Sequence, residues 1–325
     1  MTEEYHRSMV FSIHRFIMRL LYVMTKWVNE YMDSVKCQAL LLAIQYGSLT
    51  AAGKELGYTQ SGMTRMIRSL EKEIGFPLLV RNKQGVRPSA NGQQMVPVFQ
   101  EVVRASQKAA DLGAAIQGVL AGVLNIGSYY SVAAAWLPKI LRRFQAQYPK
   151  VEVHLLEGTN QELAQWINEK AVDCCLAAKP GADVAYDWIP LKDDELVVWL
   201  PPDHPWTAEK EIPVEWLNGA PFVIPLPNHD TDIDRFLAAK QVQPDIRFTT
   251  TDPYTAYCMV EEGLGISINN RLTTEKWTGR VELRPLAPAQ SISLGLAVPD
   301  IQEMSPAASK FVAQVWQIVN GKTEK

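Results

Sequence analysis

One stretch of the sequence, Gly47–Gly75, constrains the fold more than any other; it reads GSLTAAGKELGYTQSGMTRMIRSLEKEIG. Ser48 is a favourable N-cap for a short helix with small inner residues, and Gly57 supplies a stop for that helix. Thr59 can cap a second helix that runs to Ile74. The stretch therefore predicts two helices joined by a tight, glycine-containing turn.

The second helix has two faces of different chemistry. Its apolar residues recur at helical spacing and face a core: Met63, Ile67, Leu70 and Ile74. Its polar residues lie on the opposite arc: Gln60, Ser61, Thr64, Arg65 and Arg68. Taken alone, such a helix is more often a plain solvated surface helix. After a short helix and a tight turn, it predicts the recognition helix of a helix-turn-helix, with Ser48 and Thr59 as further candidates for DNA contact.

The residues after the second helix predict a short hairpin. Phe76-Pro77 ends the helix, Leu78 to Arg81 is a strand, and Val86-Arg87 returns after a turn over Asn82 to Gly85. Arg81, Lys83 and Arg87 are on or beside this turn. A basic hairpin beside a recognition helix predicts a wing that contacts DNA phosphates.

These residues resemble the N-terminal winged helix-turn-helix of the LysR-type transcriptional regulators. The matching positions are Gly47-Ser48, Ala51-Ala52, Leu56, Gln60-Ser61, Thr64, Leu70-Glu71, Gly75 and Leu78-Leu79-Val80-Arg81. The sequence departs from the family pattern at Leu79, where Phe is usual, at Gly62, where Ala is commoner, and at Pro88-Ser89, where Leu-Thr is usual. The resemblance implies DNA binding by this module, a linker helix through which two chains dimerise, and an effector-binding domain.

The charge distribution agrees with a DNA-binding module at the N-terminal side. Residues 33–90 hold eight Lys and Arg against four Asp and Glu, whereas residues 91–325 hold 20 against 28. A basic module on an acidic body favours nucleic-acid binding by the first part alone.

Cysteines and histidines predict neither a metal site nor a cofactor. The four cysteines (Cys37, Cys174, Cys175 and Cys258) have no paired spacing and no neighbouring histidines. Buried thiols in a reducing compartment are the preferred interpretation, and a redox sensor is the alternative.

Residues 1–31 are expected to be an extension outside any domain. Their apolar run is interrupted by Arg15, Arg19 and Lys26 and is too short to span a membrane. An interfacial helix is the alternative, but we expect no membrane association and a cytoplasmic protein.

A long helix is predicted after the wing, from a cap at Ser89 to about Gln117. Its seam alternates spacings of four and three: Met95, Phe99, Val102, Ser106, Ala109, Gly113 and Ile116. The seam can pack within its own chain or pair with a second copy, and we prefer pairing into a dimer or a dimer of dimers. The expected domains are 32–90 (winged helix-turn-helix), 91–121 (linker and dimerisation helix) and 122–322 (effector-binding domain).

Strands and helices alternate in the remaining chain, as in an α/β domain. A helix from Val132 to Tyr148 is expected to be capped by Ser131, and another to Lys170 by Asn160. The order resembles the effector-binding domain of the family, which has two Rossmann-like lobes, as periplasmic binding proteins do, joined by two crossing strands. The segment EEGLGISINN (residues 261–270) resembles a glycine-containing segment of that domain.

A cleft between two such lobes collects residues from strand ends and helix starts. The predicted effector-binding residues are Ser128, Tyr129, Ser131, Thr159, Asn160, Pro225, Leu226, Thr251 and Asn269. Each taken singly is more often a helix cap than a ligand contact, but their recurrence favours a pocket. Helix N-termini there predict a carboxylate or another small anion as effector, although no Lys or Arg is placed to bind it.

The sequence favours a transcriptional regulator over an enzyme. The five histidines are scattered, and no catalytic or nucleotide-binding motif follows a strand. A stand-alone solute-binding protein is the alternative, since it would share the two-lobed body, but it would not carry a basic wing module. We therefore expect a non-catalytic regulator whose binding to double-stranded DNA responds to a small molecule.

Overall fold

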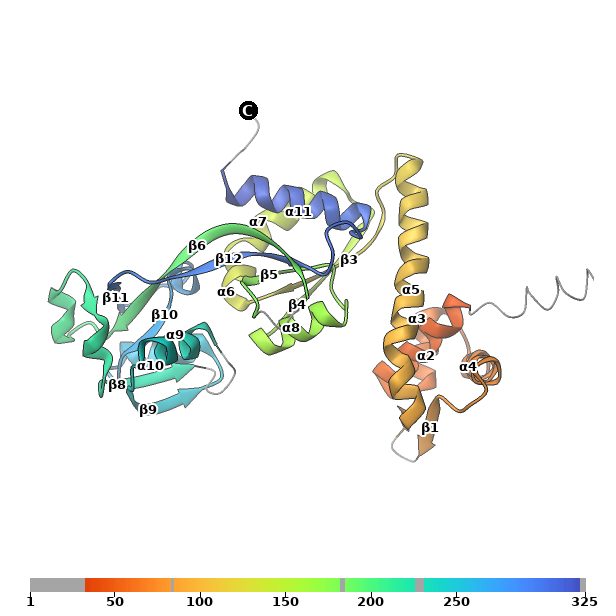
Figure 1. The fold of residues 1–325 in the computed structure, drawn as a ribbon, viewed down its shortest axis with the longest axis horizontal. Coiled ribbons are helices and arrows are strands. Elements are labelled where there is room, and N and C mark those ends of the chain that lie inside the picture. The colour runs from red at the N-terminus through yellow and green to blue at the C-terminus, as the bar shows by residue number, and fades with distance from the viewer. Residues whose placement is uncertain (1–32, 83–84, 182–184, 226–230, 322–325) are drawn as a thin grey trace, which may run out of the picture. The chain divides into compact units, whose positions relative to one another are not determined.

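The computed structural model describes residues 33–82, 85–181, 185–225 and 231–321 (Figure 1). The chain divides into two compact units, one up to Ala110 and one from Asp111 onward. The predicted N-terminal extension, Lys83 and Leu226 lie outside the described residues.

The first unit contains three short helices, a hairpin and most of a long helix. These elements are α2 (Ser34–Tyr46), α3 (Leu49–Leu56), α4 (Gln60–Ile74), β1 (Leu79–Asn82), β2 (Gly85–Pro88) and α5 (Ala90–Ile116).

The second unit alternates strands and helices along the chain. Its strands are β3 (Gly122–Ser128), β4 (Val151–Glu157), β5 (Cys174–Ala178), β6 (Asp187–Leu200), β7 (Ile212–Pro213), β8 (Pro221–Pro225), β9 (Asp245–Thr250), β10 (Ser267–Asn270), β11 (Glu282–Ala287) and β12 (Ser291–Val298). Its helices are α6 (Tyr130–Ala135), α7 (Leu137–Gln147), α8 (Asn160–Asn168), α9 (Asp232–Lys240), α10 (Pro253–Glu261) and α11 (Pro306–Val319), with short 3-10 turns η1 (Pro205–Ala208), η2 (Val214–Leu217) and η3 (Arg271–Thr274).

The helix-turn-helix forms because local caps start and stop each helix. The Ser48 hydroxyl accepts a hydrogen bond from the Ala51 N–H, and Thr59 does the same for Gly62. Gly57 ends α3 in the left-handed conformation. The predicted apolar face of α4 is buried, with Met63, Ile67 and Leu70 fully inaccessible. The two predicted helices and their turn are therefore present.

The predicted seam of α5 divides into two parts. Phe99 is completely buried in the core of the first unit, and Met95 and Val102 pack against that core. Ile116, the last residue of the seam, is 79% exposed, and Leu112, which the predicted seam did not include, is 51% exposed. The expectation that the whole seam pairs with a second copy is therefore wrong for its first half, which packs within its own chain.

Two lobes share the strands β6 and β12 (Figure 1). In the first lobe β3 lies between β4 and β5, parallel to both, and β12 adds antiparallel to β5. In the second lobe β8 and β9 are parallel, and β10 and β11 pair with the end of β6. The start of β6 pairs with β12, so this 14-residue strand crosses from one lobe to the other.

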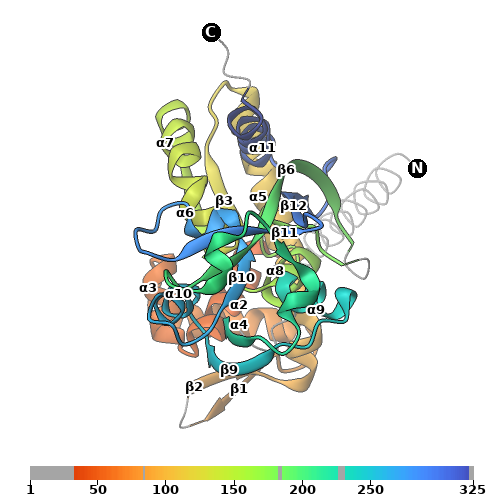
Figure 2. The same ribbon diagram turned by 90° about the vertical axis from the view of Figure 1, so that its left-hand side faces the viewer.

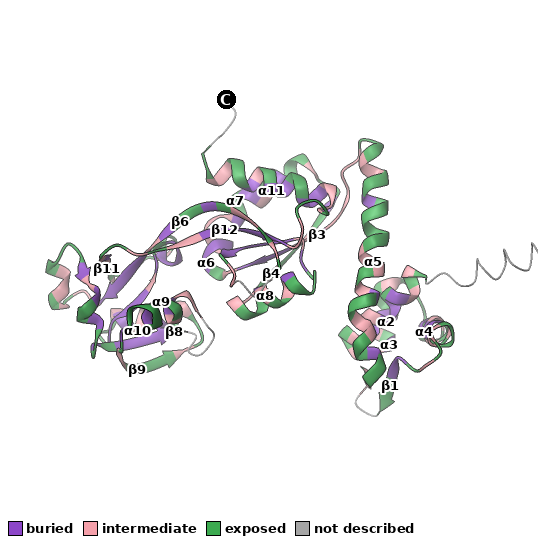
Figure 3. Cartoon of the chain, viewed as in Figure 1, coloured by how far each residue is buried: buried purple, intermediate pink, exposed green. Residues whose placement is uncertain are grey.

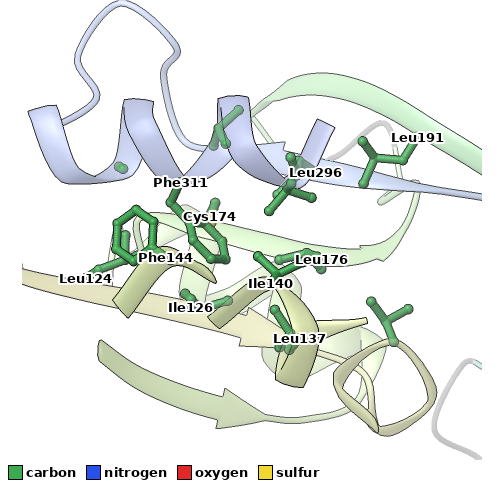
Figure 4. Packing of buried hydrophobic residues seen from close by; sticks show 14 of the residues in the cluster. Leu124, Ile126, Leu137, Ile140, Phe144, Cys174, Leu176, Leu191, Leu296 and Phe311 are labelled. Atoms are coloured by element: carbon green, nitrogen blue, oxygen red, sulfur yellow. The ribbon is translucent and has the colours of Figure 1, made fainter. Parts of the chain in front are cut away.

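Each lobe has its own buried core, and Figure 3 shows the buried residues concentrated on the strands and inner helix faces. In the first lobe, α7 and α11 lie side by side over the sheet (Figure 2). Phe144 and Phe311 meet edge to face there, with ring centroids 5.4 Å apart (Figure 4). These contacts hold the helices that position the first lobe's strand ends.

Three local predictions in the second unit are corrected by the structure. The expected helix Val132–Tyr148 is two helices that break at Trp136, because Pro138 has no N–H to continue the helical hydrogen-bond ladder. Ser131 therefore lies in the first turn of α6 and caps nothing. The cap of α8 is Thr159, which forms a reciprocal capping box with Glu162, and Asn160 is the first helical residue.

Candidate functional site

The polar face of α4 is open to solvent. Gln60, Ser61, Arg65 and Arg68 are exposed and Thr64 is half-buried, and the five line one shallow surface hollow. Three of these side chains carry amide or guanidinium groups that can form paired hydrogen bonds to base edges. Ser48 and Thr59 are at the starts of α3 and α4 as N-caps, where their hydroxyls are bonded to the backbone.

The wing is held against the recognition helix by one carboxylate. Glu71 of α4 accepts hydrogen bonds from the N–H groups of Leu78 and Leu79, at 2.8 and 3.1 Å, where the chain enters β1. Arg81 on β1 and Arg87 on β2 are both exposed. Two cationic side chains on a hairpin fixed to α4 are suited to phosphate contacts on either side of a groove.

The second unit contains a cavity of 390 Å³ between its two lobes, which we call the interlobe cleft. This volume is in the range of small-molecule sites. Seven of the nine predicted effector-binding residues line it: Tyr129, Ser131, Thr159, Asn160, Pro225, Thr251 and Asn269. The structure thus brings together residues that are far apart in the sequence.

Ser128, the eighth predicted residue, does not line the cleft. Its side chain is fully inaccessible, and its hydroxyl lies 3.1 Å from the carbonyl oxygen of Leu176. This hydrogen bond joins β3 to β5. Leu226, the ninth, is outside the described residues.

Sequence reasoning missed the acidic side chains of the cleft. Glu157, Glu162, Asp232 and Asp252 all line it. Glu157 ends β4, and Asp252 directly precedes α10, so the strand-end rule that found the other residues could have found these two.

The helix starts around the cleft are occupied by the chain's own side chains. Glu162 bonds back to the Thr159 N–H at the start of α8, and Asp234 bonds back to the Thr231 N–H at the start of α9. Asp252 accepts hydrogen bonds from the N–H groups of Tyr254 and Thr255 in α10. Three carboxylates of the protein thus already bond N–H groups at these helix starts, where an anionic ligand would compete with them.

Two hydrogen-bonded groups shape the wall of the cleft. The Tyr129 hydroxyl donates to the Asn160 side-chain oxygen, and burial raises the pKa of Tyr129 well above its usual range, so the phenol stays protonated. Asn270 donates to the buried Asp194 carboxylate at 2.6 Å, and the Leu272 N–H bonds the same group. Burial raises the pKa of Asp194, while these hydrogen bonds act to lower it.

The buried thiols do not have the character of a redox sensor. Burial raises the pKa of Cys37 to about 11 and that of Cys175 to about 12, and it also raises that of Cys174. A thiol is reactive as the thiolate, so these three groups are in the unreactive form at neutral pH. Within the described ranges, no three His, Cys, Asp or Glu side chains form a group that could hold a metal ion.

No helix among the described residues is long and apolar enough to cross a membrane.

Two family descriptions match this chain. Residues 36–93 match the bacterial regulatory helix-turn-helix protein, lysR family, and residues 117–318 match the LysR substrate binding domain.

Curated relatives are similar over most of their length. An uncharacterized HTH-type transcriptional regulator of Bacillus subtilis, YvbU, is 30% identical over 271 residues, which are 82% of this chain and 91% of the relative. The Hca operon transcriptional activator HcaR of Escherichia coli is 30% identical over 277 residues, 82% of this chain and 92% of the relative.

Solved structures share the fold at lower identity. A single-residue variant of full-length OxyR from Pseudomonas aeruginosa superposes with a TM-score of 0.71 at 23% identity, covering 89% of this chain and 96% of that one. CbnR in a complex with its target DNA gives a TM-score of 0.62 at 16% identity, covering 87% and 99%. With both family matches, a relative at 30% identity and a helix-turn-helix joined to a two-lobed domain, the chain belongs to the LysR family of DNA-binding transcriptional regulators with an effector-binding domain.

Proposed function

We propose that α4 and the β1–β2 hairpin bind operator DNA and that a small molecule in the interlobe cleft controls this binding. The observation that carries the proposal is the cleft itself, a 390 Å³ cavity lined by both lobes in a chain that also exposes a recognition helix. A ligand that contacts both lobes binds one arrangement of them better than another, and this difference shifts the equilibrium between the two.

The DNA contacts divide between helix and wing. Gln60, Ser61, Thr64 and Arg65 are in the first turns of α4, the part of a recognition helix that meets base edges. Ser48, Thr59 and Arg68 are further predicted DNA contacts, and the wing residues Arg81, Lys83 and Arg87 are suited to phosphates. Lys83 is outside the described residues, so its DNA contact is a prediction from the sequence.

An anionic effector, such as a carboxylate, is the finer prediction from the sequence. Its support was the set of helix N-termini around the cleft. Side chains of the protein bond N–H groups at three of them: Thr159 and Glu162 at α8, Thr231 and Asp234 at α9, and Asp252 at α10. The remaining one belongs to α6, which has only six residues and a correspondingly small dipole. The anionic effector therefore remains a prediction from the sequence, and side chains of the protein compete with it at these helix starts.

We further propose that the protein acts as a homo-oligomer in the cytoplasm and has no catalytic activity. The exposed apolar residues at the end of α5 support pairing of two chains, and two recognition helices suit a two-half-site operator. Cytoplasmic location follows from the proposed DNA target, and curated relatives named as transcriptional regulators support a non-catalytic role. The stand-alone solute-binding alternative does not account for the exposed face of α4.

A pair of variants in the full-length chain tests the proposal. We expect Arg65→Ala to weaken operator binding while ligand binding persists. We expect Ser131→Val, which alters the wall of the cleft, to keep ligand-free operator binding and lose the ligand response. Operator affinity with and without a ligand found by thermal-shift screening is the measurement. If Arg65→Ala leaves operator binding unchanged, or if Ser131→Val leaves the response unchanged, the corresponding half of the proposal is wrong.

A further inference from the structure

The lining of the interlobe cleft has a single sign of charge. Glu157, Glu162, Asp232 and Asp252 line it, and no Lys or Arg is among its described lining residues. Two cationic side chains, Lys179 and Arg235, line a smaller neighbouring hollow that shares Tyr129 and Asn160 with the cleft. A negative ligand would thus enter a site that already holds carboxylates and no cation to pair with it, which is unfavourable in a partly desolvated cavity.

Two of these carboxylates have no cationic partner of their own within the described chain. The Glu157 side chain has no hydrogen bond or ion pair there. Asp252 is bonded only by neutral donors, the N–H groups of Tyr254 and Thr255 and the Thr255 hydroxyl. Burial acts to raise the pKa of Asp252, but these hydrogen bonds outweigh it and the pKa is lowered, so the group is ionised at neutral pH.

A hydroxyl of the cleft is available for a ligand. Ser131 is only 8% exposed, lines the cleft, and has no hydrogen-bond partner among the residues that the structure describes. An unbonded hydroxyl that opens into a cavity is free to form a hydrogen bond with a molecule there. A hydroxyl oxygen can accept a hydrogen bond from an ammonium group.

An aromatic ring completes the set. Tyr130 lines the cleft, is 48% exposed, and lies 6.3 Å from Trp277 between ring centroids. Trp277 in turn contacts Tyr254, two residues after Asp252, at 5.2 Å. Aromatic faces attract organic cations, and their apolar surface suits a hydrocarbon skeleton.

We infer that the effector of the interlobe cleft is a small organic cation, an amine whose ammonium group is bound by Glu157, Asp252 and the Ser131 hydroxyl and whose apolar part lies against Tyr130. This inference rests on the proposed function of the cleft as the effector site. The sequence predicted an anionic effector, so this inference reverses the sign of the effector's charge.

Matched probe molecules test the sign of charge in the full-length protein. Hexylamine, hexanol and hexanoate share one type of skeleton and differ in the end group, as do benzylamine, benzyl alcohol and benzoate. Binding is measured by isothermal titration and by the shift in melting temperature. We expect an amine to bind, its alcohol to bind more weakly, and its carboxylate not to bind.

Variants connect this preference to the cleft. Asp252→Asn retains an N-cap residue while removing the charge, and Glu157→Gln removes the second charge. We expect each to weaken amine binding by about tenfold or more. Asp203→Asn, an exposed Asp outside the cleft lining, is the matched control and should leave amine binding unchanged.

The outcomes separate this inference from the proposal on which it rests. Carboxylates that bind in preference to amines, with binding blocked by Ser131→Val, would overturn the cationic effector and leave the cleft as the effector site. Binding that survives Ser131→Val, Asp252→Asn and Glu157→Gln alike would place the ligand elsewhere and overturn both. A panel in which no amine binds would also overturn the inference.

Discussion

At the scale of single residues, the DNA-binding unit separates side chains that can read bases from those that can bind phosphates. Arg65 is exposed on the first half of α4, and Arg81 is exposed on the hairpin. A guanidinium that bonds a base edge discriminates between sequences, whereas one that bonds a phosphate contributes equally to all of them.

We expect Arg65→Ala to cost about 1–3 kcal/mol of operator binding and to reduce the preference for the operator over unrelated DNA. Arg81→Ala should weaken both equally and lower the salt dependence by about one unit in the slope of log affinity against log salt. Binding titrations on both DNAs at several salt concentrations provide the measurement. Equal loss of preference in the two variants would contradict this division.

A glycine at the start of α5 is required by a close backbone approach. A Cβ atom on Gly92 would lie 2.0 Å from the carbonyl oxygen of Leu78, whereas one on Gly113 of the same helix would meet nothing within 4 Å. We expect Gly92→Ala to destabilise the first unit by about 1–3 kcal/mol, since backbone atoms must move apart. Gly113→Ala should instead stabilise the helix by up to about 1 kcal/mol. Urea unfolding of both variants tests this. A Gly92→Ala protein as stable as the parent would show that the backbone at Gly92 and Leu78 can move apart without loss of stability.

At the scale of elements, α5 serves two different purposes along its length. Its first half completes the core of the first unit through Phe99. Its second half presents Leu112 and Ile116 to solvent. Substitutions at Phe99 or Val102, two residues of the seam that was expected to pair, would therefore damage the core of their own unit.

We expect Leu112→Asp or Ile116→Asp to dissociate the oligomer without unfolding the chain, because a charge is placed on an apolar surface that a second copy would bury. Sedimentation should show the smaller species, and binding to a two-half-site operator should weaken. Ala110→Asp, exposed on another side of the same helix, is the control and should remain assembled. If Leu112→Asp and Ile116→Asp both stay assembled, the chains pair through another surface.

At the scale of the whole molecule, the partly buried carboxyl of Asp173 couples folding to pH. Burial raises the pKa of Asp173 from 3.8 to about 6; the Asn125 N–H, which donates to it at 2.7 Å, acts to lower the pKa, and nearby Asp111 acts to raise it. Between these two values the folded chain holds a proton that the unfolded chain has released. The contribution of Asp173 to the free energy of unfolding therefore falls as pH rises through this window.

We expect Asp173→Asn to remove this dependence, because the amide oxygen can still accept from Asn125 but cannot ionise. The variant should match the parent at about pH 4 and exceed its stability at about pH 7 by up to about 3 kcal/mol. Urea unfolding across this range is the measurement, with Asp203→Asn as the control. A parent whose stability rises over this window, while that of Asp173→Asn does not, would contradict the assignment.

The DNA-binding unit was accessible from the sequence because its determinants are local. Ser48, Thr59 and Gly57 act on backbone groups within a few residues of themselves, and the spacing of Met63, Ile67 and Leu70 already defines the buried face. The sequence by itself therefore determined the helix-turn-helix, the wing and the alternation of strands and helices that follows. The strand ends that line the interlobe cleft followed from that alternation.

Only the tertiary structure decided which surfaces are covered and which charges meet. Phe99 and Ile116 occupy the same seam, but one is buried and the other exposed because the first unit covers only part of α5. The pairing of β6 with β11 and β12 also depends on strands that are distant in the sequence. The acidic lining of the cleft likewise arises because Glu157 and Asp252, far apart in the sequence, are brought to one cavity by the fold. Burial, pairing and charge depend on neighbours in space, which local sequence patterns do not specify.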